Sequence, residues 1–372
     1  MKGAVFMSGF HGERLKVAIY GESHGPSVGL VVDGLPPGLT INIEEVAKEM
    51  KRRAPGRSPL ATPRKEQDEF LVESGLFHGK TTGTPLCVRI PNSDTRSGDY
   101  ALLKDVMRPG HADYAGRIRY MNFNDYRGGG HFSGRLTAPL VFAGAVAKQL
   151  LALQGIRVAA HIASVGNVED VAFNPMGERQ ETLAGLAQKE LPVLDEEQGE
   201  KMRQLILAVR EQEDSVGGKV ECMVTGLPAG LGDPFFDSVE SRLAHALFSI
   251  PAIKGLEFGA GFALAAMQGS EANDPMQFTD GEAGFKSNNN GGLLGGITTG
   301  MPLFFKVAVK PTPSIGKPQE TVDLTKRENT VLQITGRHDP SIVLRAVPVV
   351  EGVAAWIISD LLLSSARNLT VK

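Results

Sequence analysis

The sequence predicts an α+β fold of the mixed α/β class, in which residues 1–372 form a single domain made of two similar halves. Strand-like runs of β-branched and aliphatic residues occur together with segments whose apolar residues recur at helical spacing. A strand, a turn and a helix follow one another once in each half of the chain. No low-complexity linker divides the sequence, so we expect one continuous domain.

The first half begins with two predicted strands, residues 16–20 and 28–33, in which aliphatic residues run between turn signals. Residues 43–53 have the spacing of an amphipathic helix, which Pro55 and Gly56 end. A longer helix is predicted over residues 138–154.

The second half contains three further predicted helices, at residues 199–213, 237–248 and 349–367. In the last of them the apolar residues recur at helical spacing and predict a buried stripe. Residues 167–204 are rich in acidic side chains and predict a polar insertion on the surface.

A six-residue turn supports the prediction of two related halves. Gly34-Leu-Pro-Pro-Gly-Leu39 follows the strand 29–33, and Gly226-Leu-Pro-Ala-Gly-Leu231 follows a strand-like segment at 220–224. A helix is predicted after each turn. Glycine and proline are common in any turn, so a chance similarity stays open at this point.

Composition excludes several classes of protein. A net charge of −3 gives no general attraction to nucleic acid or an anionic membrane. Two cysteines are too few for a disulfide scaffold, and the eight histidines lack metal-ligand spacing, so no metal is expected. The N-terminal segment has no signal-peptide core, and no apolar run reaches the roughly 20 residues of a membrane span. We therefore expect a cytoplasmic protein.

Two short motifs resemble well-known active-site patterns but lack the right context. Gly21-Glu-Ser23-His24-Gly25 matches the G-x-S-x-G nucleophile elbow, yet a second strand follows where the elbow requires a helix. We therefore expect His24 to be the working residue and Ser23 to assist it. The segment from Gly75 to Thr81 resembles a phosphate-binding loop with one residue too few between its glycines.

Titratable residues lie on three turns with glycine or proline flanks, at residues 21–25, 108–114 and 336–340, and in a separate cationic segment. Six cationic residues lie between Lys51 and Lys65, which suits a small polyanionic ligand or a solvated helix end. His111 follows a Pro-Gly turn, and Asp339 follows an arginine and a histidine in another turn. If these turns meet, the site suits proton removal and loss of an anionic leaving group. A hydrolase using Ser23 and His338, and an anion- or nucleic-acid-binding module, are the alternatives.

At these residues the sequence closely resembles the chorismate synthase family, and the similarity runs almost end to end. The motifs that carry it are Gly21–Gly25, 33–38, Arg52-Arg53 with Pro55-Gly56, 92–100, Arg108–Tyr114, 249–259, 287–296, 310–314 and 336–340.

The resemblance implies a β-α-β sandwich of two similar halves and a homotetramer. It also implies an enzyme that converts 5-enolpyruvylshikimate 3-phosphate to chorismate and phosphate by trans-1,4-elimination, with reduced FMN as cofactor. The source of the flavin's electrons stays open, either NAD(P)H on this chain or an outside reductant.

The resemblance also implies roles for individual residues. His24 would protonate the departing phosphate, His111 would lie beside the flavin ring, and Asp339 would take the C6 proton of the substrate. Ser23 and Ser133 would support these groups. The residues implied at the substrate are Arg53, Arg57, Arg135 and Arg337, and those implied around FMN are Ser133, Ala252, Gly295, Lys310, Pro311, Thr312, Pro313, Ser314 and Arg337.

The chain departs from the family pattern at six positions, two of which are Gly134 and Leu136 in place of an alanine and a glutamate. His131 and Phe132 stand where an arginine and a serine are usual before Ser133, so the implied FMN phosphate contact changes there. Pro59 replaces an arginine, for which Arg57 is our expected substitute, and Asn124 replaces another.

Overall fold

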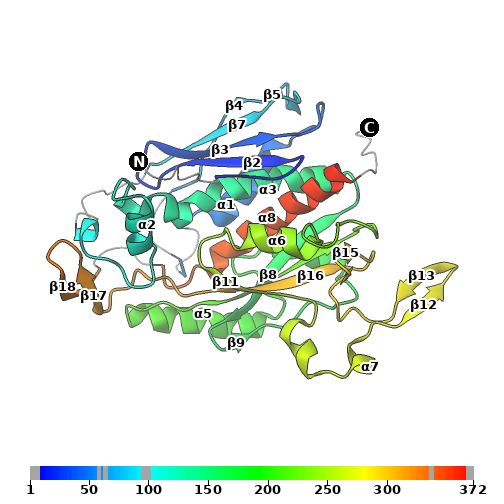
Figure 1. Ribbon diagram of the computed structural model, residues 1–372. Helices are drawn as coiled ribbons and strands as arrows, with labels where there is room; N and C mark the ends of the chain where they lie inside the picture. The colour runs from blue at the N-terminus through cyan, green and yellow to red at the C-terminus, as the bar shows by residue number, and fades with distance from the viewer. Residues whose placement is uncertain (1–8, 57–59, 62–65, 94–101, 335–338, 366–372) are drawn as a thin grey trace.

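Two antiparallel sheets enclose a layer of helices, as predicted for a β-α-β sandwich (Figure 1). The computed structural model describes residues 9–56, 60–61, 66–93, 102–334 and 339–365. The first sheet has the order β1 (Phe10–His11), β2 (Lys16–Gly21), β3 (Ser27–Asp33), β7 (Leu86–Pro91), β4 (Leu71–Ser74). The second has the order β11 (Ile253–Phe258), β16 (Leu303–Val309), β10 (Gly218–Thr225), β8 (Arg157–Val165), β9 (Val168–Glu169).

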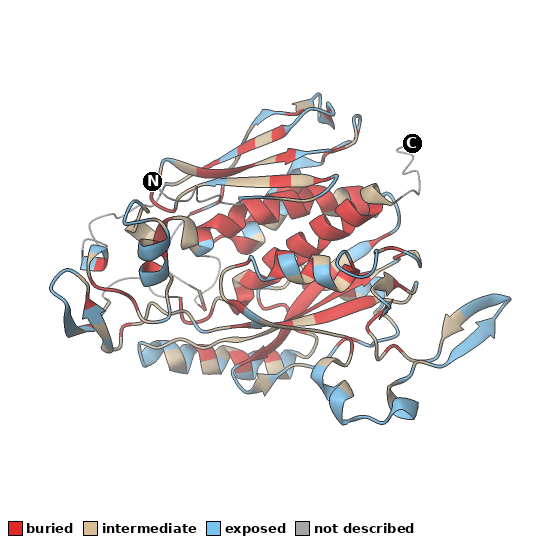
Figure 2. Ribbon diagram, in the orientation of Figure 1, coloured by how far each residue is buried: buried red, intermediate tan, exposed pale blue. Residues whose placement is uncertain are grey.

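The helical layer consists of α1 (Ile43–Arg53), α3 (Thr137–Ala152), α6 (Val239–Leu247) and α8 (Val343–Ser364). Figure 2 shows that α3 and α8 are buried along most of their length. They cross at two glycines, because a Cβ on Gly144 would overlap the backbone of Gly352. The α8 helix is long and apolar enough to cross a membrane, but 94% of its most apolar window is buried inside the protein. It therefore has the surroundings of a core helix.

Smaller elements lie around the sandwich. Four short hairpins are β5 (Leu76–Phe77) with β6 (Lys80–Thr81), β12 (Met276–Thr279) with β13 (Glu282–Phe285), β14 (Leu293–Leu294) with β15 (Ile297–Thr298), and β17 (Gln319–Asp323) with β18 (Glu328–Leu332). The remaining helices are α2 (Asp113–Arg119), α4 (Gln180–Leu186), α5 (Glu196–Glu211) and α7 (Gly269–Ala272), with 3-10 turns at Leu102–Lys104, Arg127–Phe132, Gly134–Leu136 and Gly261–Ala266. Figure 1 shows α5 along the outer face of the second sheet, and the β12–β13 hairpin projecting from the body.

Local sequence explains where the helices begin and end. The α1 helix has the predicted bounds, because the Asn42 side chain accepts hydrogen bonds from the first-turn amides and cationic residues occupy the last turn. In α6, the Ser238 hydroxyl accepts from the Ser241 amide, so the helix starts two residues later than predicted. The α8 helix begins at Val343, earlier than predicted, and includes Pro348. Burial of its apolar side chains outweighs the backbone hydrogen bond that this proline cannot donate.

The repeated turn has the same hydrogen bonds in both halves. In the first half, the Thr81 hydroxyl donates to the Pro36 carbonyl at 2.6 Å and accepts from the Leu39 amide at 2.9 Å. In the second half, the Thr298 hydroxyl donates to the Pro228 carbonyl at 2.7 Å and accepts from the Leu231 amide at 2.9 Å.

These two threonines belong to a longer repeat. Residues 75–86 and 292–303 share the pattern G-L-x-x-G-x-T-T-G-x-P-L, and each segment forms a hairpin that leads into a central strand. The segment that resembles a phosphate-binding loop is therefore the first of two matched hairpins. Their strands β7 and β16 pair with the matched strands β3 and β10.

The predicted polar insertion contains α4 and the first part of α5. Its beginning is tied to the second sheet by His161 of β8, which is fully buried. The His161 ring lies 2.9 Å from an Asp170 carboxylate oxygen and 2.8 Å from one of Glu221.

Candidate active site

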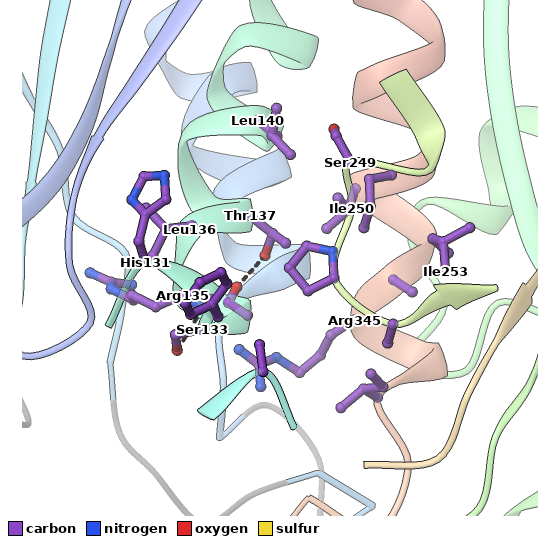
Figure 3. Close-up of a pocket in the computed structure, with 18 of the residues that line it drawn as sticks. His131, Ser133, Arg135, Leu136, Thr137, Leu140, Ser249, Ile250, Ile253 and Arg345 are labelled. Atoms are coloured by element: carbon purple, nitrogen blue, oxygen red, sulfur yellow. Dashed lines mark hydrogen bonds between the residues drawn. The ribbon is translucent and has the colours of Figure 1, made fainter. Parts of the chain in front are cut away.

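One cavity of about 1030 Å³ lies between the start of α3, the segment that follows α6, and the start of α8 (Figure 3). Both halves contribute to its walls. Polar side chains include those of Arg108, His111, His131, Ser133, Arg135, Lys254, Lys310, Thr312, Ser314, Asp339 and Arg345. Apolar side chains include those of Phe132, Leu136, Leu140, Ile250, Ala252, Ile342 and Val349.

The loop before α3 lies against two predicted histidines at adjacent residues. Gly128, Gly129 and Gly130 all have positive φ, at 59°, 86° and 53°, which residues with a Cβ rarely adopt. A Cβ on Gly128 would overlap the His24 ring, and one on Gly129 would lie 3.0 Å from His111 Nε2. Glycine at these positions therefore lets both imidazoles approach the loop.

His111 is held by a buried network on its own turn. Its Nδ1 lies 2.6 Å from Asp113 Oδ1. Arg108 donates to the same carboxylate from Nε at 2.7 Å and from Nη2 at 2.7 Å. Burial opposes ionisation of Asp113, but the hydrogen bonds from Arg108 and His111 outweigh it and hold the pKa of Asp113 well below its usual range.

The Arg108–Asp113 turn is fastened to the segment 310–314 from the other half. The Lys310 ammonium donates to the Gly110 carbonyl, and Arg108 Nη1 donates to Ser314 Oγ at 3.3 Å. The Lys310 amide donates to the Ala252 carbonyl at 2.9 Å. Two motifs about 200 residues apart are thus joined at the cavity wall.

Asp339 is buried at the cavity and contacts an arginine that has no motif around it. Arg345, on the first turn of α8, donates from Nη1 to Asp339 Oδ2 at 2.9 Å. It also donates from Nε to the Arg53 carbonyl at 3.0 Å. In Figure 3 the Arg345 side chain extends from α8 into the cavity, toward the loop that carries Arg135. Arg345 and Asp339 thus form an ion pair at the cavity wall.

The two predicted substrate arginines in the described part of the chain share one carboxylate. Arg53 donates to Asp68 at 2.7 Å from Nε, and Arg135 forms an ion pair with the other oxygen of Asp68. Burial, together with the nearby Arg345 and Arg135 guanidinium groups, lowers the pKa of Arg53 to about 10, although Asp68 opposes this. Arg135 lines the cavity, whereas Arg53 is buried behind it with 1% exposure.

The structure gathers most of the predicted site. His111, Ser133, Arg135, Ala252, Lys310, Thr312, Pro313, Ser314 and Asp339 line the cavity. Ser23 and His24 lie one layer behind it, where the Ser133 hydroxyl donates to Ser23 Oγ at 3.2 Å. Because β3 and no helix follows Ser23, the local structure is not that of a nucleophile elbow.

Besides Ser23, His24 and Arg53, four predicted residues are not among the described residues of the lining. Pro311 lies in the 310–314 segment but outside the wall, and Gly295 lies in the β14–β15 hairpin. That hairpin sits at the start of α6, since the Val239 amide donates to the Gly296 carbonyl, whereas the end of α6 faces the cavity. Arg57 and Arg337, like Pro59 and His338, fall outside the described residues.

Sequence reasoning gave no role to several residues of the site. Arg345 and Asp68 are remote from their partners in sequence and belong to no pattern, so no signal in this single sequence indicated them. Asp113 was visible two residues after His111, and that spacing on a rigid turn was a usable signal. The substituted His131 lines the cavity, with Nδ1 3.0 Å from the Gly21 carbonyl oxygen.

Comparisons with known proteins agree over nearly the whole chain. The sequence profile of the family described as chorismate synthase matches residues 15–363. A chorismate synthase of Pyrococcus abyssi (strain GE5 / Orsay) is 50% identical over 353 residues, 95% of this chain and 97% of that protein. One of Methanosarcina acetivorans is 47% identical over 367 residues, 98% of this chain and 97% of that protein. A crystal structure of chorismate synthase matches with a TM-score of 0.75 and 30% identity, covering 95% of this chain and 93% of that chain.

Proposed function

Because this chain belongs to the chorismate synthase family and is a lyase of the shikimate pathway, we propose that it converts 5-enolpyruvylshikimate 3-phosphate to chorismate and phosphate with reduced FMN. The observation that carries the proposal is the single cavity shared by His111, Asp339 and the 310–314 segment. It joins a proton-transfer group, a carboxylate base and a cation-bearing loop.

The proposed chemistry removes a proton from C6 of the substrate and expels its allylic phosphate. Asp339, held as a carboxylate beside Arg345, takes the proton. His24 protonates the departing phosphate, and the Ser23 and Ser133 hydroxyls orient the groups around it. Arg135 supplies positive charge at the anionic substrate. Arg53 helps to hold Arg135 in place, because both arginines pair with Asp68. Arg57 and Arg337 remain proposed contacts from the sequence.

The residues of the cavity fit a flavin mononucleotide. Its volume of about 1030 Å³ is at the upper end of ordinary ligand pockets, as a cofactor together with a substrate requires. Thr312 Oγ1, on the cavity wall, is buried and has no hydrogen-bond partner among the residues that the structure describes. A buried hydroxyl in this state is ready to contact a ligand.

The same wall suggests how the cofactor would be held. The Lys310 ammonium and the hydroxyls of Thr312 and Ser314 suit a phosphate, while Leu136, Leu140 and Ile250 suit an aromatic ring system. When bound, reduced FMN supplies an electron-rich ring beside the substrate as phosphate leaves. His131 is the nearest replacement for the arginine of the family pattern, so we propose a weaker phosphate contact there.

We also propose that the protein is a cytoplasmic homotetramer. Cys87 and Cys222 are unpaired, as is usual in a reducing compartment. The segment 260–285 exposes large apolar side chains, with Phe262 83% and Phe278 80% exposed, which favours burial against another subunit. Light scattering should give a tetrameric mass, reduced in Phe262→Ser/Phe278→Ser; a monomeric mass at micromolar concentration would reject the assembly.

The decisive experiment measures phosphate release from 5-enolpyruvylshikimate 3-phosphate under anaerobic conditions. We expect release with dithionite-reduced FMN and none with oxidised FMN or with dithionite alone. Release that is independent of flavin would reject the cofactor, and a phosphate ester hydrolysed without chorismate would reject the elimination. FMN should also bind more tightly when substrate is present, because the two would stack in one cavity.

A further inference from the structure

The Arg108–Asp113 turn holds the His111 ring against a carboxylate that has no role in the proposed reaction. The turn is closed by a hydrogen bond from the His111 amide to the Arg108 carbonyl at 3.3 Å, with Pro109 and a Gly110 at φ 71° between them. This is the pattern of a type II turn, which fixes the position of the His111 backbone. Asp113 then begins α2 and faces back toward the His111 ring.

His111 Nδ1 has two polar neighbours, and they imply opposite protonation states. Asp113 Oδ1, at 2.6 Å, accepts a hydrogen bond and so requires a proton on Nδ1. Arg108 Nη2, at 3.1 Å, only donates and would require Nδ1 to be unprotonated. The two neighbours cannot both be satisfied by the ring in one state.

The geometry decides between them. An unprotonated Nδ1 would face a carboxylate oxygen, lone pair to lone pair, at the shorter of the two distances. Arg108 Nη2 has another acceptor, because it donates to Asp113 Oδ1 at 2.7 Å. Asp113 is 8% exposed and stays ionised, so its need for donors is strong.

We propose that Asp113 is a positioning residue that keeps a proton on Nδ1 of His111, so that Nε2 is the atom that exchanges protons with the cavity. Arg108 holds the carboxylate in place from the other side. Nε2 lies on the side of the ring that faces Gly129, away from Asp113. The inference rests on the proposed role of His111 in the reaction, but the tautomer itself does not.

The tautomer can be observed without substrate, flavin or turnover. We expect ¹⁵N NMR of the full-length, flavin-free protein, labelled at histidine, to show His111 Nδ1 protonated and Nε2 unprotonated once the ring is neutral. The His111→Gln variant identifies the resonances. If Nδ1 is the unprotonated nitrogen in the wild-type protein, the proposal is wrong, whatever the activity of any variant.

Substitution of Asp113 tests the consequence. Asp113→Asn should lower turnover by about 10- to 1000-fold and give a mixed or reversed His111 tautomer, while Asp113→Glu should recover part of both. The matched control is Asp105→Asn, an acidic residue near the same turn whose side chain accepts from Thr325 Oγ1 and does not line the cavity.

The outcomes separate the two proposals. An Asp113→Asn protein that keeps the Nδ1-protonated ring and turns over within about twofold of wild type would overturn the positioning role. If Asp113→Asn does not fold, the wild-type spectrum alone decides. A correct tautomer in a protein that releases no phosphate would reject the proposed reaction and leave the assignment of the ring standing.

Discussion

The two halves of the molecule repeat their framework but not their chemistry. Thr81 and Thr298 make the same hydrogen bonds at the same turn, to within 0.1 Å. At the cavity, the loop before α3 contributes Gly128 and His131, whereas the turn before α8 contributes Asp339. Repeated residues therefore mark what the fold needs, and residues without a counterpart mark what the proposed reaction needs.

The largest expected effect comes from the unrepeated histidines. His24→Ala and His111→Ala should each lower turnover by about 10- to 1000-fold, because each removes a proposed proton-transfer group. The matched control is His78→Ala, in the exposed turn of the first repeated hairpin, which should leave turnover unchanged. Steady-state kinetics of chorismate formation measure this. Near-normal turnover of both the His24 and His111 variants would remove the distinction between framework and chemistry.

Substitution of the two glycines at the crossing of α3 and α8 should lower the stability of the protein by unequal amounts. A Cβ on Gly144 would meet backbone atoms of Gly352, whereas the nearest atom to a Cβ on Gly352 is the Leu140 carbonyl oxygen at 3.2 Å. Gly144→Ala should therefore destabilise the protein by about 3 kcal/mol, and Gly352→Ala by less. Urea unfolding monitored by circular dichroism gives both values. Equal losses would contradict the close approach at Gly144.

Substitution of the matched Thr81 and Thr298 should lower the unfolding free energy by similar amounts. Thr81→Val and Thr298→Val each remove one hydroxyl that bonds two backbone groups of the turn, at a cost of about 1–3 kcal/mol. We expect the two losses of unfolding free energy to agree closely. Thr82→Val should cost little, because among the described residues the Thr82 hydroxyl bonds only to that of the exposed Thr84 and to its amide. A large loss of unfolding free energy at one turn with none at the other would show that the two turns do not contribute equally to stability.

The smallest expected effect concerns the buried His161, which lies in the second half of the chain. Burial disfavours the His161 imidazolium, but hydrogen bonds to Asp170 and Glu221 outweigh this and raise the pKa of His161 above 6.5. The stabilisation is therefore complete below the unfolded pKa of about 6.5 and is lost as pH rises through the higher folded value. The difference in unfolding free energy between wild type and His161→Gln should shrink by on the order of 1 kcal/mol as pH rises toward 9. If this difference in unfolding free energy grows as pH rises, the predicted upward shift of the His161 pKa is wrong.

Much of the fold could be read from the sequence because its signals are local. The α1 helix has a capping Asn42 and a Pro-Gly end, and the strands β2 and β3 lie between turn residues, so their bounds were predicted well. The start of α8 was missed because Pro348 suggests a boundary, and only burial of the whole helix overrides it.

The site was predictable where rigid turns carry titratable residues, as at His111 and Asp339. It was not predictable where partners come from distant elements. The fold brings Arg345 to Asp339, and Asp68 to both Arg53 and Arg135. No residue spacing in a single sequence predicts these contacts.

The glycine loop before α3 has a mechanical consequence. His24 and His111 contact adjacent residues of one backbone segment, so a displacement of that segment changes the space left for both rings. The two imidazoles cannot adjust independently. A single methyl group added at Gly128 should disturb proton delivery by both rings at once.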